Sequence, residues 1–335
     1  MNGAKTPLWK QLFKVFLKLG VAALLIAWVI GGDARSMLES VRRMDPVWVV
    51  LCFCAQFLQV TLTGVRWKFL IAKELNVSWY EAMRLAFIGL FANIFIPAGA
   101  VGGDVLKAAV LASKVEKGRR IEATVSILVD RIVGIGGLFL LVLFSFCLMF
   151  RRIGELPVAA KSIVYLFSLL SAGGIGVIAV LFFQDYIFRW KFAAKLLEIA
   201  DRWMKGIPGS IIRSVSAYRT RWKTLVLTTL FSALILHPLL FGALYFLLYG
   251  AMRELPPADV TLTASAYGNL ASAVPVTPGG LGTRDAVVKI LLNAWGIPEN
   301  SAVTAMVIYT AVLLLTNLLG GIAFLLPAEW RKKKE

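Results

Sequence analysis

The chain has 335 residues, of which 59% are hydrophobic and 16% charged, and its formal net charge is +17. A soluble domain is nearer half apolar and about a quarter charged, so this composition excludes an ordinary soluble enzyme. The Lys and Arg residues stand between the apolar stretches, where the positive-inside rule and anionic lipid head groups account for them. We therefore expect no nucleic acid among the partners.

Apolar runs of about 20 residues have the length that a helix needs to cross the hydrocarbon of a bilayer. Backbone groups in lipid must form their hydrogen bonds within the protein, so these runs should be helices. We predict an all-α integral membrane protein with a single membrane domain over residues 1–335. In chain order, about six full spans are predicted at 13–30, 47–71, 121–150, 162–183, 225–250 and 302–326.

Two further apolar stretches, 82–112 and 262–295, do not read as clean spans. Each is too long for one span and is broken at its centre by Gly and Pro residues. Such a break in lipid is tolerated only inside protein or around a cavity, so we predict two re-entrant broken hairpins. The residues predicted to break them are Pro97, Gly102, Gly103, Pro278, Gly279, Gly280 and Gly282.

The basic residues predict an orientation, because cytoplasmic connections carry the excess of Lys and Arg. Their alternation places both termini in the cytoplasm of a multi-pass protein of the plasma (inner) membrane. Segment 186–207 has charged residues every three or four positions opposite an apolar face. This pattern predicts an amphipathic helix on the cytoplasmic surface, and a loop helix packed on other loops is the alternative.

The same topology predicts an inverted repeat. Segments 47–150 and 222–326 each comprise a span, a broken hairpin and a span, in opposite orientations, and 151–221 supplies a linking span and the amphipathic helix. Both hairpins carry the pattern P-x-G-x-x-x-x-D, which ends at Asp104 in the first and at Asp285 in the second. Inverted units with interrupted helices indicate a transport site near the bilayer midplane.

Arg284 is the strongest single candidate for a contact with an anionic head group. It stands near a predicted half-helix N-terminus, where the helix dipole disfavours a cation, and its planar fork suits phosphate oxygens. The adjacent Asp285 or a water-filled mouth would also account for the cation. The structural alternative is an ion pair that holds the hairpin shut, with Asp104 or Asp130 as possible partners. Asp104 itself caps its half-helix, faces a cavity or does both, and Thr283 is the predicted cap before Asp285.

The other candidates are ionisable or polar groups at membrane depth, which usually face a cavity or a partner because burying them in lipid is costly. For Asp130 and Arg131 the alternative is a position at the inner interface, from which their side chains reach the head groups. Lys107 and Lys289 follow Asp104 and Asp285 by three and four residues, so local ion pairs are also expected. The predicted head-group residues are Arg284, Asp285, Asp104, Asp130, Arg131, Lys107, Asn93 and Arg66.

The catalytic possibilities are few. The only histidine, His237, stands alone in an apolar run, and the three cysteines are also inside apolar runs. Catalysis calls for a nucleophile with its base or a set of acid–base groups, and a metal site for clustered ligands. We therefore expect no enzymatic activity, no catalytic residues, no metal and no cofactor.

The ordered set of motifs resembles the flippase-like transmembrane region of lysylphosphatidylglycerol synthases over about residues 15–326. The motifs are Arg66-Trp67, residues 93–97, Gly102-Gly103-Asp104 with Lys107, Asp130-Arg131 before Gly134, and residues 278–282 with Arg284-Asp285. The resemblance implies a membrane protein that moves an anionic (phospho)lipid or lipid-linked intermediate between leaflets. A membrane scaffold or accessory subunit of a lipid or glycolipid biosynthesis enzyme is the alternative.

The resemblance also bears on partners. The synthases carry a soluble aminoacyl-transferase domain after the membrane region, whereas this chain ends at Glu335 after the last predicted span. We therefore expect translocation without synthesis, with anionic membrane lipids as the ligands. A homo-oligomer and a partner lipid-synthesis enzyme both stay open, as do the identity of the lipid and the direction of transport.

Overall fold

The computed structural model describes residues 34–71, 75–95, 102–187, 218–274, 277 and 280–327, with the single positions 20, 24, 27 and 195. Every element within these residues is a helix, as a backbone in lipid requires. Their bounds are α2 Ala34–Arg43, α3 Pro46–Leu70, α4 Trp79–Phe95, α5 Gly102–Lys114, η3 Lys117–Arg119, α6 Arg120–Ile153, α7 Val158–Ile187, η4 Arg219–Arg221, α10 Trp222–Phe231, η5 Ser232–Leu236, α11 His237–Met252, α12 Ala258–Ala273, α13 Thr283–Ala294 and α14 Glu299–Leu325.

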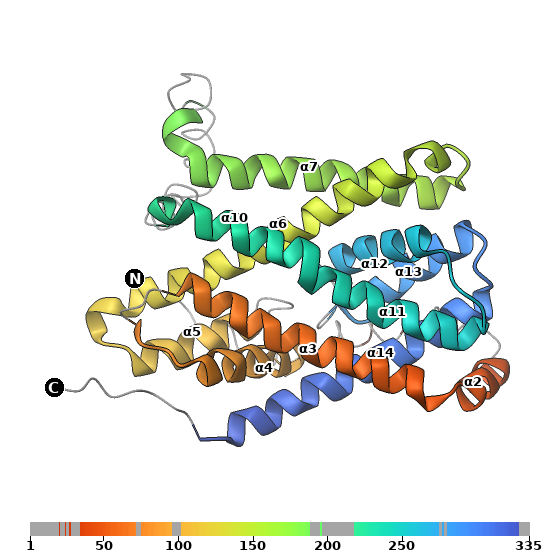
Figure 1. Cartoon of the computed structure of the whole chain (residues 1–335), viewed down its shortest axis with the longest axis horizontal. Coiled ribbons are helices and arrows are strands. Elements are labelled where there is room, and N and C mark those ends of the chain that lie inside the picture. The colour runs from red at the N-terminus through yellow and green to blue at the C-terminus, as the bar shows by residue number, and fades with distance from the viewer. Residues whose placement is uncertain are drawn as a thin grey trace.

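Five helical stretches within the described residues are long and apolar enough to cross a membrane: α3, α6, α7, the continuous run α10–η5–α11, and α14. They coincide with five of the predicted spans, and Figure 1 shows them running lengthwise through the molecule. Nearly all of the predicted span 13–30 and of the predicted amphipathic helix 186–207 falls outside the described residues. Helix α2 was not predicted. It contacts the start of α14, where the Asn300 side chain donates to the Ser40 hydroxyl across 3.0 Å.

Two pairs of short helices stand where the broken hairpins were predicted. The first pair is α4 and α5, with 17 and 13 residues, and the second is α12 and α13, with 16 and 12 residues. A helix needs about 20 residues to cross the hydrocarbon, and all four of these helices are shorter than that. The partners within each pair pack against one another.

The two pairs start from opposite ends of the long helices. Arg66 near the end of α3 contacts Asp130 near the start of α6, so α3 and α6 run antiparallel. Helix α4 begins beside the end of α3, where the rings of Phe69 and Trp79 are 5.3 Å apart. Helix α12 begins beside the end of α6, where Arg152 and Asp259 form a 2.8 Å ion pair. Figure 1 accordingly shows α4–α5 and α12–α13 toward opposite ends of the bundle.

The contacts between helices come in matching sets for the two units. Helix α3 packs on its counterpart α11. The contact of α4 with α14 matches that of α12 with α6, and the contact of α5 with α6 matches that of α13 with α14. Replacing each helix of α3–α6 by its counterpart in α10–α14 therefore reproduces the same contacts. The predicted inverted repeat would give such an exchange of contacts. The repeat itself and the orientation of its two units in a membrane stay predictions.

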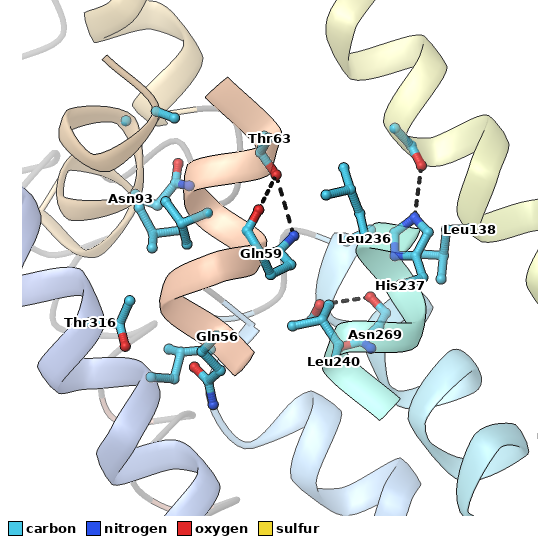
Figure 2. A pocket seen from close by; sticks show the side chains of 18 of the residues that line it. Gln56, Gln59, Thr63, Asn93, Leu138, Leu236, His237, Leu240, Asn269 and Thr316 are labelled. Carbon is cyan, nitrogen blue, oxygen red and sulfur yellow. Dashed lines mark hydrogen bonds between the residues drawn. The ribbon is translucent and has the colours of Figure 1, made fainter. Parts of the chain in front are cut away.

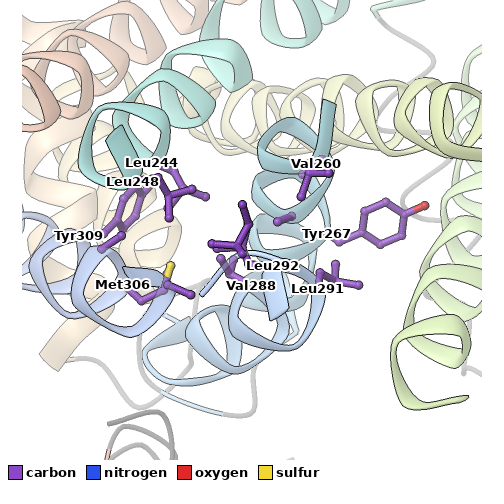
Figure 3. Packing of buried hydrophobic residues seen from close by; sticks show 14 of the residues in the cluster. Leu244, Leu248, Val260, Tyr267, Val288, Leu291, Leu292, Met306 and Tyr309 are labelled. Carbon is purple, nitrogen blue, oxygen red and sulfur yellow. The ribbon is translucent and has the colours of Figure 1, made fainter. Parts of the chain in front are cut away.

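The largest apolar core lies where α11, α12, α13 and α14 meet, with α6 and α7 beside them. Figure 3 shows residues from both short helices of the second pair among its members: Leu244, Leu248, Val260, Tyr267, Val288, Leu291, Leu292, Met306 and Tyr309. The Tyr267 hydroxyl is 2.6 Å from that of Ser168, which ties α12 to α7. Large apolar side chains such as Leu169 and Leu227 are exposed, as lipid-facing positions should be.

Candidate functional site

A polar cavity of about 340 Å³ lies at the centre of the bundle, between the two short-helix pairs. Seven of the eight predicted head-group residues line it, and they come from α3, α4, α5, α6 and α13: Arg66, Asn93, Asp104, Lys107, Asp130, Arg131 and Arg284. Asp285, the eighth, does not line the cavity but accepts a hydrogen bond from Arg284, which does. The structure therefore brings together residues that are more than 200 positions apart in the chain.

Arg66 is held on three sides by buried groups. Its Nε donates to the Asp130 carboxylate across 2.9 Å, and one terminal nitrogen donates to the Asp130 carbonyl. The other terminal nitrogen donates to the Ser232 hydroxyl at 2.8 Å. Arg66 is 6% exposed and Asp130 5%. Removing one partner of such a buried pair costs about 3–5 kcal/mol, so this pair fixes α3 against α6 and η5.

Ser232 opens a π-helical turn that the sequence did not predict. Segment η5 spans Ser232–Leu236, and the His237 amide closes it by donating to the Ser232 carbonyl. Pro238 follows and lacks a backbone N–H, which disturbs the regular helical ladder at this point. The turn brings Ser232 to Arg66 and lets the His237 Nε2 meet the Gly134 carbonyl at 3.1 Å. Single π turns inside long helices are frequent at functional sites.

Asp104, Arg131 and Lys107 form a cluster of charged side chains, two of which are the most accessible charges that line the cavity. Its carboxylate lies 3.0 Å from Arg131 and 4.0 Å from Lys107, and the Lys107 ammonium stands 5.5 Å above the Trp67 ring. The side chains of Asp104 and Arg131 are 23% and 29% exposed, compared with 7% for Arg66 and 6% for Arg284. The local pair expected between Asp104 and Lys107 is therefore present, at the long end of an ion-pair distance.

Asp104 does not cap α5, contrary to one of the two predicted roles. Helix α5 begins at Gly102, which puts Asp104 in its first turn, and the Asn93 side chain accepts from the Gly103 amide at 2.7 Å. Asn93 thus satisfies a free N–H at the start of α5 from the neighbouring helix α4. A Cβ at Gly103 would lie 2.0 Å from the Gly89 carbonyl oxygen, so this close approach requires glycine.

Arg284 is engaged by the protein itself. Its guanidinium donates to Asp285 at 3.0 and 2.7 Å, contacts the Thr310 hydroxyl and lies 4.3 Å from the Tyr309 ring centre. Of the acids considered for Arg284, Asp285 is its partner, whereas Asp104 pairs with Arg131 and Asp130 with Arg66. The helix dipole disfavours a cation at the helix N-terminus, and the adjacent Asp285 carboxylate compensates the charge of Arg284 there.

Asp285 also stabilises the start of α13. Its second carboxylate oxygen accepts from the Gly282 amide at 3.1 Å, and Gly282 is the residue that caps the helix, with φ of 81°. The prediction that Thr283 is the cap was therefore wrong by one position; Thr283 donates to the Gly280 carbonyl instead. Lys289, expected to pair with Asp285, lies 2.8 Å from Glu299. Pro97, Pro278 and Gly279 fall outside the described residues.

Uncharged polar side chains make up most of the remaining polar lining. Five carboxamides line the cavity: Gln56, Gln59, Asn93, Asn269 and Asn317. Figure 2 labels the first four, together with Thr63 and Thr316. Only Asn93 was predicted as a site residue. A polar residue inside a predicted span or broken hairpin is the signal that marks the others, since lipid-facing positions seldom carry one.

Among the described residues that line the cavity, four are basic and two acidic, an excess of two positive charges. Asp285 behind Arg284 reduces this local excess by one. A cavity of this sign, enclosed by apolar helices, concentrates anions. Its volume falls within the ~300–1,000 Å³ typical of small-molecule sites.

Comparison with known proteins adds a family to this geometry. The family described as the lysylphosphatidylglycerol synthase TM region matches residues 15–321. A UPF0104 membrane protein of Pyrococcus horikoshii is 24% identical over 324 residues, which cover 92% of this chain and 95% of that protein. A UPF0104 membrane protein of Methanocaldococcus jannaschii is 24% identical over 307 residues, which cover 87% and 88% of the two chains.

Proposed function

The chain belongs to the lysylphosphatidylglycerol synthase transmembrane family, and on that premise we propose that it translocates an anionic lipid between the leaflets of a bilayer. The lipid head group passes through the central cavity while its chains stay in lipid. The observation that carries the proposal is the cavity itself, which lies between two short-helix pairs from opposite ends and has an excess of basic side chains. Interrupted helices that meet around a polar site are the usual architecture of transporter sites.

A second hollow beside the cavity supports a lipid, rather than a free anion, as the transported ligand. An apolar groove of about 370 Å³ lies between α3, α4 and α14, and is lined by residues such as Phe57, Phe87 and Ile322. Helices α3 and α4 line both hollows, the cavity with one face and the groove with another. A polar head group and an apolar chain can therefore be held at the same time.

The geometry favours Arg131 and Lys107, rather than Arg284, as the phosphate contacts. Arg284 and Arg66 are buried and already bonded to carboxylates and hydroxyls. Arg131 is more accessible and shares Asp104 with Lys107. We propose that a phosphate takes the place of Asp104 beside these two cations. A phosphate brings the same kind of charge-assisted hydrogen bonds that Asp104 gives up.

The proposal makes the chain a transporter rather than an enzyme or a scaffold. Each of the six charged side chains that line the cavity in the described structure belongs to an ion pair. The arrangement supplies fixed charges for binding, and we propose no bond-making step. A scaffold would need no such charged cavity, since burying these groups in a membrane protein is costly.

The test is lipid flux in liposomes that contain only this protein. Phosphatidylglycerol with a fluorescent chain, and dithionite outside, reports the lipid that reaches the outer leaflet. We expect flux above protein-free liposomes and a loss of roughly tenfold in Arg131→Gln, the effect of losing one charged hydrogen bond of about 1.5 kcal/mol. Arg152→Gln removes an arginine from a partly exposed pair outside the cavity and should leave flux unchanged. No flux above protein-free liposomes would favour the scaffold.

A further inference from the structure

We infer that the head group admitted by the cavity is a hydroxylated phosphate, such as a polyol or sugar phosphate, and not one that carries an amino acid. The inference rests on the proposed function and names the substrate class of the same site. It comes from the kind of polar groups in the lining, from two unpaired acceptors there and from the pairing of the carboxylates. These three observations are independent of the family match.

The first observation is the kind of polar group present. Five carboxamides and the hydroxyl groups of Thr63, Ser272 and Thr316 line one cavity of about 340 Å³. Carboxamides offer both donors and acceptors without charge, which is the combination that hydroxyl groups match. A bare phosphate would need only donors and would leave the acceptor half of this lining unused.

The second observation is that two acceptors in this lining have no partner. Asn317 is 3% exposed, and its Oδ1 is buried without a hydrogen bond. In His237 the Nε2 meets the Gly134 carbonyl, an acceptor, which places the ring proton on Nε2 and leaves Nδ1 as an acceptor. That Nδ1 is also buried without a partner. Buried polar atoms in folded proteins are nearly always paired. Both side chains line the cavity, but both atoms are covered in the ligand-free protein, so a hydroxyl of a ligand pairs with them after a small rotation of the side chain.

The third observation concerns the carboxylates, which an ammonium group would require. Asp104 faces Arg131 and Lys107, Asp130 faces Arg66, and Asp285 faces Arg284. Each is already matched by a cation, and the lining has an excess of positive charge. A lysyl or other aminoacyl head group would meet like charges, whereas neutral hydroxyls would not. The cavity thus selects for hydroxyls and against ammonium groups.

The experiment compares four short-chain lipids as ligands of the purified protein in detergent. The probes are dioctanoyl forms of phosphatidylinositol, phosphatidylglycerol, phosphatidic acid and lysyl-phosphatidylglycerol, and the readout is the rise in melting temperature with concentration. We expect the two polyol lipids to bind roughly fivefold or more tightly than phosphatidic acid, the ratio given by one hydrogen bond of about 1 kcal/mol. Lysyl-phosphatidylglycerol should bind most weakly.

A matched pair of variants ties this selectivity to the cavity. Asn317→Leu removes the unpaired acceptor, so it should leave the ligand-free melting temperature unchanged or higher while the preference for phosphatidylinositol over phosphatidic acid falls toward one. Asn293 also has a buried, unpaired Oδ1 but lies outside the cavity, and Asn293→Leu should keep the preference. Asn317→Asp adds an unmatched carboxylate and should raise the affinity for lysyl-phosphatidylglycerol.

The outcomes separate the two levels of the argument. Equal binding of phosphatidic acid and phosphatidylinositol, or tighter binding of lysyl-phosphatidylglycerol by the unaltered protein, would overturn the inference and leave translocation standing. Glycerophosphoinositol, the same head group without chains, should bind far more weakly than the lipid; equal binding would overturn the lipid as its source. Selective binding without flux in liposomes would remove translocation and keep the head-group class.

Discussion

At the scale of single residues, the site is built from charges that the protein has already matched. Arg66 with Asp130 and Arg284 with Asp285 are buried pairs that also hold hydroxyl groups from neighbouring helices. Arg131 with Asp104 is more open to the cavity. A buried pair that is fully bonded is poorly suited to exchange with a ligand, because its desolvation is already compensated. The residues thus divide into two structural pairs and one exchangeable group.

Arg284 tests this division. Because Asp285 would be left buried without its partner, Arg284→Ala should lower the free energy of unfolding by about 3–5 kcal/mol. The double variant Arg284→Leu with Asp285→Asn leaves no unmatched charge and keeps an acceptor for the Gly282 amide, so it should recover most of the loss. Melting in detergent measures both. A well-folded Arg284→Ala protein with normal melting but no flux would return Arg284 to the lipid-binding group.

The sequence predicted which residues belong to the site but not how they pair. Ionisable side chains inside apolar runs are costly, so Asp130, Arg131 and Arg284 could be singled out without a structure. Their partners depend on how each helix is rotated against its neighbours, which no local pattern specifies. For that reason the sequence left Asp285, Asp104 and Asp130 all open as partners of Arg284, of which Asp285 is the one observed, and Ser232 and Asn317 were missed.

At the scale of elements, glycine and proline decide where the membrane helices break. The pattern around residues 97–104 and 278–285 predicted two interrupted stretches, and short helices stand on both sides of each. The cap that Asn93 provides for α5, by contrast, depends on a contact between two helices. The π turn η5 depends on contacts of Ser232 and His237 with α3 and α6. Such features follow from packing and are not visible in periodicity.

The re-entrant arrangement predicts that both ends of each helix pair face the same side of the membrane. In a chain whose native cysteines are replaced by serine, single cysteines at Trp79 and Ser113 flank the first pair, and those at Leu255 and Asn300 flank the second. A charged thiol reagent should label the first two from the cytoplasm only and the last two from outside only.

Leu169→Cys, exposed on the apolar helix α7, is the control that lipid should shield. If the two ends of either pair are labelled from opposite sides, that pair crosses the membrane once as a single broken span, and the inverted repeat is wrong. Labelling of all four positions from one side would contradict the opposed orientation of the two pairs while keeping each hairpin re-entrant.

At the scale of the whole molecule, the two units of the predicted repeat are interleaved rather than adjacent. Helix α4 of the first unit packs on α14 of the second, and α12 of the second packs on α6 of the first. Polar links also cross between them, such as Arg66 to Ser232 and His237 to the Gly134 carbonyl. The cavity therefore exists only where both units are present, since each contributes part of its lining.

This interleaving predicts that the two units assemble with one another but do not stand alone. A chain cut between residues 200 and 201 separates α2–α7 from α10–α14 without breaking a described helix that crosses the core. Coexpressed fragments should copurify through a tag on one of them and restore flux, because helix packing and buried hydrogen bonds hold membrane helices together without a covalent link.

Either fragment expressed alone would expose the polar cavity residues to lipid, which is costly, and should aggregate in mild detergent. Gel filtration of each fragment, alone and together, measures this. Two fragments that each elute as a stable, monodisperse species and do not copurify would show two independent bundles, and the shared cavity would then lose its basis.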